Sequence, residues 1–407
     1  MLQGATALAG AAVGWPGISL AQNKPIRIGM PTVLTGRIAM MGRSSRNGAM
    51  QEAEKFNAAG GLNGRRIEIV VRDSKGQPQE AARNARELVT REGCEILVDA
   101  EPSSGALAVH EVARELGVLC LHTVSEASSL TADPKLHVPT AFRCARMAIH
   151  DAIVGGAYAA KVSRDKGVRH WMTCSPDYAY GRDTTAEFLT YLRRFNKDVE
   201  VIGEFWPQFM QPDYSRELAR IVLSKVQAVY SALWGGDLAA FIDQGNIFGF
   251  FNRLEFFSPN MADYTVLAAT KYVPPSIHSG NRYLRGFPST PANQGWADAY
   301  LAKNREMPTN WSWANASAIS FLAVALKAAQ STDGKKLSEA LRGMRIPSPF
   351  GANGELTLRA QDHTLIGYAT GWGGLTTTEP YMPSPVAGDW KLILELEAEW
   401  KKGKAWA

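Results

Sequence analysis

Short apolar segments of strand-forming residues alternate with longer helical segments along most of the chain, and this alternation constrains the fold more than any other feature. The strands expected in the first part of the chain are 26–31, 67–73, 95–100 and 118–123. The helices expected between them are 43–61, 78–90 and 105–116. Strands separated by helices of this length form parallel βαβ units and a doubly wound sheet. The pattern restarts after Arg143 with strands at 170–175, 199–207 and 228–234, so we expect a second α/β lobe.

The stretch "AAGGLNGRRIEIVVRD" shows how one such unit is made. Ala49, Ala53 and Phe56 recur at helical spacing and give the preceding helix one apolar face. Gly60 and Gly61 then stop that helix, and the basic turn after them leads into the next strand. We therefore interpret these glycines as parts of a scaffold, because the phosphate-binding pattern GxGxxG is absent here.

Composition agrees with an ordinary globular protein of two domains. The chain has 407 residues, of which 45% are hydrophobic and 20% are charged, so it can bury two large cores. The net charge is +5, but lysine and arginine are scattered, which disfavours nucleic acid as a partner.

Residues 1–23 carry no charge and contain a short apolar run ending in Ser19-Leu20-Ala21. Small residues at these positions are typical of a signal peptidase site, and the run is too short for a transmembrane helix. We predict a signal peptide remnant, cleavage after Ala21 and export to the bacterial periplasm.

Four cysteines, Cys94, Cys120, Cys144 and Cys174, are widely spaced and form no CxxC pair. This disfavours zinc binding and thioredoxin-like chemistry. Cys94 and Cys120 fall at strands of one expected sheet, so they either form a disulfide or remain buried free thiols.

Motifs for enzymatic chemistry are missing from the sequence. No GxGxxG, GxxxxGK[ST], GxSxG or HExxH pattern occurs, and the seven histidines lack metal-ligand spacing. We therefore expect no cofactor, no metal and no catalytic residue. In doubly wound sheets a ligand binds at the loops that follow the carboxyl ends of the strands.

The segment 26–89 resembles the first lobe of the leucine/isoleucine/valine-binding protein family, the type I periplasmic solute-binding proteins of ABC transporters. Thr35-Gly36, the turn at Gly42, "NAAGGLNGRRIEIVVRD" and the helix after "QPQEA" carry the resemblance. "SSLT" at 128–131 and "DYAYG" at 177–181 extend it into both lobes. It implies two Rossmann-like lobes joined by a three-segment hinge, with one small ligand enclosed between them. We expect lobe 1 at 24–143 plus 277–352 and lobe 2 at 144–276 plus 353–407.

Ligand contacts follow from the resemblance by position only. The family loop that holds a ligand carboxylate corresponds to "EPSSGA", which implies Ser103 and Ser104, although either serine could instead cap a helix. The remaining candidates implied by position are Val124, Ser125, Glu126, Tyr180, Trp234, Asn260, Asp263 and, as an apolar wall, Met41.

Departures from the family pattern bear on the ligand. Glu126 stands where amino-acid binders place threonine, and Asn260 stands where they place an acid for the ligand ammonium, with Asp263 three residues further on. We therefore predict a small carboxylate with a flat or aromatic body, with amino acids and amides as alternatives.

The resemblance implies a monomeric importer receptor that delivers its ligand to membrane permease subunits. A ligand-sensing regulator of the amide-sensor type is the alternative function, and an enzyme on the same scaffold is a third.

Overall fold

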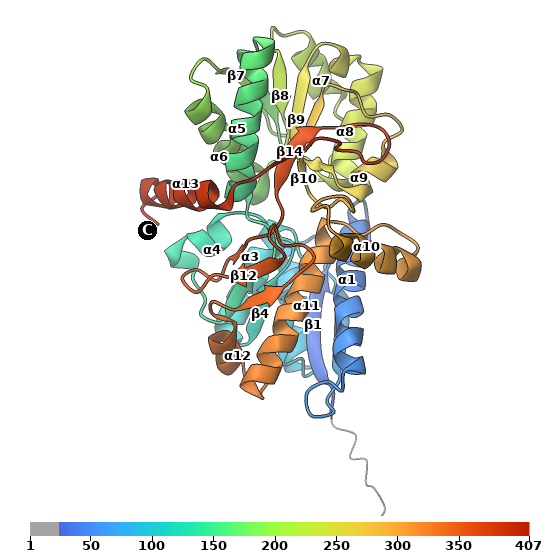
Figure 1. Cartoon of the computed structure of the whole chain (residues 1–407), viewed down its shortest axis with the longest axis vertical. Coiled ribbons are helices and arrows are strands. Elements are labelled where there is room, and N and C mark those ends of the chain that lie inside the picture. The colour runs from blue at the N-terminus through green and yellow to red at the C-terminus, as the bar shows by residue number, and fades with distance from the viewer. Residues whose placement is uncertain (1–23, 407) are drawn as a thin grey trace, which may run out of the picture.

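A computed structural model describes residues 24–406, so the predicted signal segment lies outside the described residues. Two α/β lobes are stacked along the long axis of the molecule (Figure 1). The first sheet is parallel throughout, in the order β2-β1-β3-β4-β5. Its strands are β1 (Ile26–Thr32), β2 (Ile67–Asp73), β3 (Ile96–Asp99), β4 (Leu119–His122) and β5 (Ala141–Arg143).

Helices cover both faces of this sheet, and some of them come from distant parts of the chain. They are α1 (Ala39–Ala58), α2 (Pro78–Thr90), α3 (Ser103–Leu116), α4 (Ser129–Ala132), α10 (Pro291–Asn304), α11 (Asn310–Ala329) and α12 (Gly334–Leu341), with a 3-10 turn at Pro134–Leu136. Figure 1 shows α11 packed beside α1. This packing requires Gly48, because a Cβ there would lie 2.1 Å from the carbonyl oxygen of Ser312.

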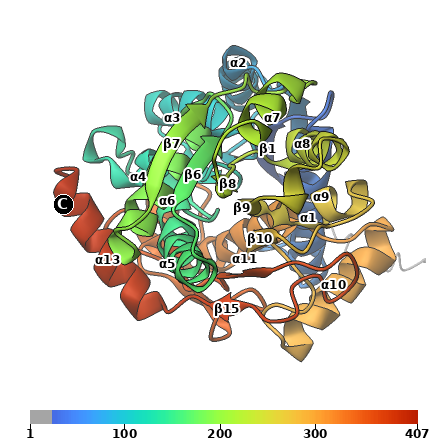
Figure 2. The ribbon, with the colours of Figure 1, turned by 90° about the horizontal axis from the view of Figure 1, so that it is seen from above.

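The second sheet has the order β15-β14-β10-β9-β8-β6-β7. Its strands are β6 (His170–Cys174), β7 (Glu200–Phe205), β8 (Ala228–Tyr230), β9 (Glu255–Ala262), β10 (Ile277–Asn281), β14 (Gly371–Gly374) and β15 (Val386–Ala387). The helices of this lobe are α5 (Ala148–Lys166), α6 (Ala179–Phe195), α7 (Ser215–Val222), α8 (Gly235–Ile247), α9 (Tyr264–Ala269) and α13 (Trp390–Gly403), with a 3-10 turn at Phe250–Asn252. Figure 2 shows α13 on the outside of the lobe next to α5.

Two expected crossing points between the lobes need correction. The return to lobe 1 was expected at residue 277, but β10 pairs with β9 in the second sheet, so the chain leaves that sheet only after Asn281. The last passage was expected at residue 353, but the small antiparallel sheet of β11 (Arg345–Pro347), β12 (Glu355–Leu358) and β13 (Leu365–Ile366) comes first. The chain joins the second sheet again only at β14.

The glycines of the stretch discussed above end a helix, as predicted. α1 stops at Ala58, and Gly60, Gly61 and Gly64 follow with positive φ angles. A Cβ at Gly61 would lie 2.1 Å from the carbonyl oxygen of Arg65, so the turn into β2 needs glycine there. The doubly wound α/β architecture predicted from the alternation is confirmed in both lobes.

All four cysteines are buried free thiols, so the Cys94–Cys120 disulfide considered from the sequence is not formed. Burial raises the pKa of the Cys94 thiol to about 11, which keeps it protonated at neutral pH. Within residues 24–406, no helix combines the length and the apolar character needed to cross a lipid bilayer.

Candidate ligand-binding site

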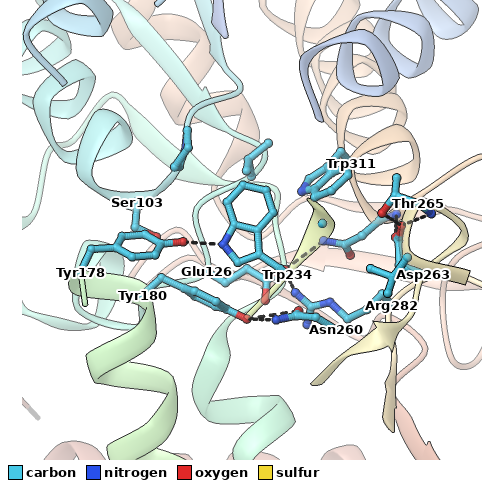
Figure 3. A pocket seen from close by; sticks show the side chains of 15 residues that line it. Ser103, Glu126, Tyr178, Tyr180, Trp234, Asn260, Asp263, Thr265, Arg282 and Trp311 are labelled. Atoms are coloured by element: carbon cyan, nitrogen blue, oxygen red, sulfur yellow. Dashed lines mark hydrogen bonds and ion pairs between the residues drawn. The ribbon is translucent and has the colours of Figure 1, made fainter. Parts of the chain in front are cut away.

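A pocket lies between the two sheets, where loops following β3, β4, β6, β8 and β9 meet (Figure 3). Its unfilled space is about 450 Å³, part of it open to solvent. Aromatic side chains and a few polar groups line it together, as in pockets that take a small organic molecule. Its position at the carboxyl ends of parallel strands is the one expected for a doubly wound fold.

Seven of the ten predicted contact residues line this pocket. They are Ser103, Val124, Glu126, Tyr180, Trp234, Asn260 and Asp263. The ring of Trp234 thus lies at the pocket and is not packed beneath its own loop.

The other three predicted residues lie nearby but do not line the pocket. Met41 is fully buried in the core of lobe 1, because α1 begins at Ala39 and so includes a residue expected in a loop. Ser104 lies in the first turn of α3. Ser125 is buried, and its hydroxyl donates to Ser103 Oγ at 3.0 Å. Ser125 therefore supports a residue of the pocket wall.

Three long helices without a side-chain cap begin at the pocket, since Ser103, Tyr180 and Gly235 of their first turns line it. α3 begins at Ser103, while α6 and α8 begin directly after Tyr178 and Trp234. In none of these three described helices does a side chain cap the first turn. The residue before α3 is Pro102, so Ser103 and Ser104 do not act as its N-cap. Converging N–H groups at positive helix ends favour an anion.

Two buried acids, Asp99 and Glu101, precede α3, and their raised pKa values disfavour the negative charge that would compete with an anion at the N-terminus of this helix. Burial raises the pKa of Asp99 and of Glu101 well above the ordinary range. A chain of hydrogen bonds agrees with a protonated Asp99: His110 Nε2 lies 2.6 Å from the carbonyl oxygen of Leu136 and must donate to it. His110 Nδ1 then accepts from His122 Nε2 at 3.0 Å, which leaves His122 Nδ1 to accept from Asp99 Oδ2 at 2.6 Å.

Aromatic side chains form one wall of the pocket. The rings of Trp234 and Trp311 lie 5.7 Å apart in an edge-to-face arrangement. Trp234 Nε1 donates to the hydroxyl of Tyr178 at 2.8 Å, which fixes the orientation of the indole. Tyr180 OH and the Asn260 amide hydrogen-bond each other at 2.9 Å. This wall is suited to a flat apolar body.

A buried cluster of four charges reaches the pocket through Glu126 and Arg282. Arg282 lines the pocket and pairs with Glu126 of lobe 1 and, at 2.7 Å, with Asp151 of α5. Arg146 pairs with Asp151 at 2.5 Å. Burial alone would raise the pKa of Asp151, but the two arginines hold it below its ordinary value. Two guanidinium groups thus balance two carboxylates.

Asp263, the second acid at the pocket, accepts hydrogen bonds from the chain on both of its oxygens. Its Oδ1 accepts from the backbone N–H and the hydroxyl of Thr265, at 2.9 and 2.7 Å. Its Oδ2 accepts from the backbone N–H of Asn310 at 2.8 Å. Burial raises the pKa of Asp263. Asp263 therefore acts as a cap for α9 and for the start of α11.

Comparison with known proteins assigns the chain to a family. A family model described as periplasmic binding protein matches residues 25–370. The chain belongs to this periplasmic binding protein family.

One relative is a leucine-, isoleucine-, valine-, threonine- and alanine-binding protein of Pseudomonas aeruginosa. It is 24% identical over 343 residues, which cover 84% of this chain and 88% of the relative.

Two solved structures of similar fold are solute-binding proteins of ABC transporters from Rhodopseudomonas palustris. One is in complex with 3,4-dihydroxybenzoic acid and matches with a TM-score of 0.79 and 20% identity, covering 89% of this chain and 96% of the other. The other is in complex with benzoate and matches with a TM-score of 0.76 and 20% identity, covering 89% and 95%.

In this binding protein, side chains of the two lobes contact each other directly. Arg37, in the loop after β1, pairs with Asp237 of α8 at 3.3 Å. Ser129 of α4 donates to Asp183 of α6 at 3.1 Å. The conformation is therefore a closed one, with the pocket between contacting lobes.

Sequence reasoning missed several residues that line the pocket of the binding protein, including Tyr178, Arg282, Asn310 and Trp311. Asn310 and Trp311 begin α11, and Thr309 caps that helix. The threonine before an apolar helical run is a readable capping signal, but nothing local shows that this helix points at the pocket. Within the described part of the chain, no group of three His, Cys, Asp or Glu side chains could hold a metal ion.

Proposed function

We propose that this chain is the solute-binding receptor of an ABC importer, that it works in the periplasm, and that its ligand is a small carboxylate with a flat or aromatic body. The receptor would capture this ligand between its lobes and deliver it to membrane permease subunits. Relatives and similar structures include proteins named for amino acids and proteins in complex with benzoates. The choice between these ligand classes therefore rests on the pocket.

Charge balance in the pocket is the observation that carries the proposal. Glu126 and Asp151 are already compensated by Arg282 and Arg146, and Asp263 accepts three hydrogen bonds from the chain. Asp263, the wall acid without a cationic partner, already accepts hydrogen bonds on both oxygens, so it offers few free positions to the three donors of a buried ammonium group. The free N–H groups of α3 still favour an anion. The site therefore suits a monoanion better than a zwitterionic amino acid.

The two ends of the ligand would be held differently. Ser103 Oγ can donate its proton to the ligand carboxylate while accepting from Ser125, next to the free N–H groups of the first turn of α3. Hydrogen bonds of this charge-assisted kind contribute about 1.5–3 kcal/mol each. Trp234, Trp311 and Tyr180 would contact the ring, where offset or edge contacts add about 0.5–1.5 kcal/mol beyond the burial of area.

Isothermal titration calorimetry with benzoate, phenylalanine and leucine tests the ligand class. We expect benzoate to bind most tightly and Trp234→Ala to weaken it at least about tenfold. Trp206→Ala is the matched control, because Trp206 lies in the same lobe but packs against Arg182 outside the pocket. Micromolar leucine binding, no heat with benzoate and an unaffected Trp234→Ala variant would defeat the proposal.

A further inference from the structure

The carboxylate of Glu126 is used by the protein on one oxygen only. Arg282 Nη2 and Asn310 Nδ2 both donate to Oε1, the latter at 3.0 Å. Oε2 accepts no hydrogen bond from any of residues 24–406, and Glu126 lines the pocket while being only 4% exposed. An acceptor left unpaired in such a place requires a donor from whatever fills the pocket.

The charge of Glu126 is already neutralised, but its second carboxylate oxygen still lacks a hydrogen-bond donor. Arg282 supplies the compensating charge, and that guanidinium is itself shared with Asp151, which Arg146 also neutralises. Oε2 therefore needs a hydrogen-bond donor, and it does not need a further positive charge. A neutral donor such as a ring hydroxyl or a ring amine meets this requirement without adding buried charge.

We infer that Glu126 selects ligands by accepting a hydrogen bond on Oε2, so that the preferred ligand is an aromatic acid carrying a neutral hydrogen-bond donor on its ring. This inference rests on the proposed function, because it takes the ligand to be an aromatic acid. It adds a specificity-determining residue and a chemical requirement beyond the flat carboxylate itself.

The geometry also fixes what a glutamine would do at this position. In Glu126→Gln, the donors from Arg282 and Asn310 would hold the amide oxygen at the place of Oε1. The amide nitrogen would then take the place of Oε2 and point its hydrogens into the pocket. The substitution therefore changes an acceptor into a donor at the ligand.

Two ring substituents test this change directly. The amino group of 4-aminobenzoate donates and is a poor acceptor, whereas the methoxy group of 4-methoxybenzoate only accepts. We expect the wild-type protein to bind 4-aminobenzoate at least about tenfold more tightly than 4-methoxybenzoate, and Glu126→Gln to reverse that order. The meta isomers are titrated in parallel, so that the ring position of the donor does not decide the result.

Glu187→Gln is the matched control. Glu187 is also a buried acid, but it lies in α6 and does not line the pocket. This variant should keep the wild-type order of affinities. If Glu126→Gln fails to fold, the comparison of the aminobenzoates with the methoxybenzoates on the wild-type protein still decides the question.

The outcomes separate the two proposals. If benzoate binds but donor and acceptor derivatives bind equally in both isomer series, or if Glu126→Gln leaves their order unchanged, the role of Glu126 is overturned while the aromatic-acid receptor stands. If none of the benzoates binds, the proposed ligand class itself fails, and the inference fails with it.

Discussion

Replacing Asp151 with asparagine should destabilise the protein strongly, because this carboxylate compensates two buried arginines. Asp151 is 2% exposed and accepts hydrogen bonds from Arg146, Arg282 and, at 2.8 Å, the hydroxyl of Thr370. In Asp151→Asn, Arg146 would lose its carboxylate partner and Arg282 would keep its pair with Glu126. Removing one partner of a buried ion pair costs about 3–5 kcal/mol.

The size of the chain sets the expected thermal shift. At about 2.1 cal/mol/K per residue, the unfolding entropy of a chain this long is about 0.8 kcal/mol/K, so a loss of about 4 kcal/mol lowers Tm by about 5 °C. Circular dichroism with heat and with urea measures both quantities. Asp165→Asn is the control: Asp165 lies on the same helix, but its pair with Lys161 is exposed, and its loss should stay within about 0.5 kcal/mol.

The pH dependence checks the cause of the loss. Because the folded-state pKa of Asp151 is lowered, its contribution is complete above the ordinary pKa near 4 and is lost as the pH falls through the folded value. The gap between wild type and Asp151→Asn should therefore be full at pH 7 and shrink in strong acid. A loss of less than about 1 kcal/mol at pH 7, equal to that of Asp165→Asn, would refute the reasoning.

Two further results are expected. Small-angle scattering with a saturating benzoate should give a smaller radius of gyration than without ligand, since two lobes joined by three short segments close as rigid bodies; identical profiles would count against hinge closure. Asp99→Asn should be at least as stable as wild type at pH 7. The raised pKa of Asp99 means that the wild type loses stability as the pH rises above about 4, whereas an asparagine amide can still donate to His122. Urea unfolding at pH 5 and pH 7 measures this difference, and a clear loss of stability at pH 7 would place the shared proton on His122.

The two sheets could be predicted from the sequence because each depends on local patterns. Strands such as 67–73 and helix starts such as Pro78 carry their own signals of periodicity and capping. The second crossing was placed too early because the sequence of β10, IHSGN, does not say which sheet this buried strand joins. Register with a distant strand decides that question.

The site was predictable where a loop follows a strand, and unpredictable where the contact is long-range. Ser103, Glu126 and Trp234 follow β3, β4 and β8, so the topology places each of them at the carboxyl edge of its own sheet. Arg282 and Asn310 meet Glu126 across 156 and 184 residues of sequence. No local pattern encodes such a pair, and only the folded chain shows that the charge of Glu126 is already matched.

The charge cluster that reaches the pocket through Glu126 and Arg282 also joins the segments that link the lobes. Arg146 follows the first crossing, Arg282 opens the second, and Thr370 ends the third, and all three side chains donate to Asp151.

Arg282 in turn holds Glu126, so a single guanidinium connects lobe 1 with α5 of lobe 2 at the pocket wall. A rotation of the lobes must therefore either pivot about Arg282 or break its pair with Glu126. In the second case, Arg282 would hold and compensate Glu126 only in the closed form, and the donor that the ligand presents to Oε2 would contribute to closure as well as to affinity. Measuring the change in radius of gyration with 4-aminobenzoate and with 4-methoxybenzoate at equal saturation would distinguish the two, because a pivot about Arg282 predicts the same closure for both.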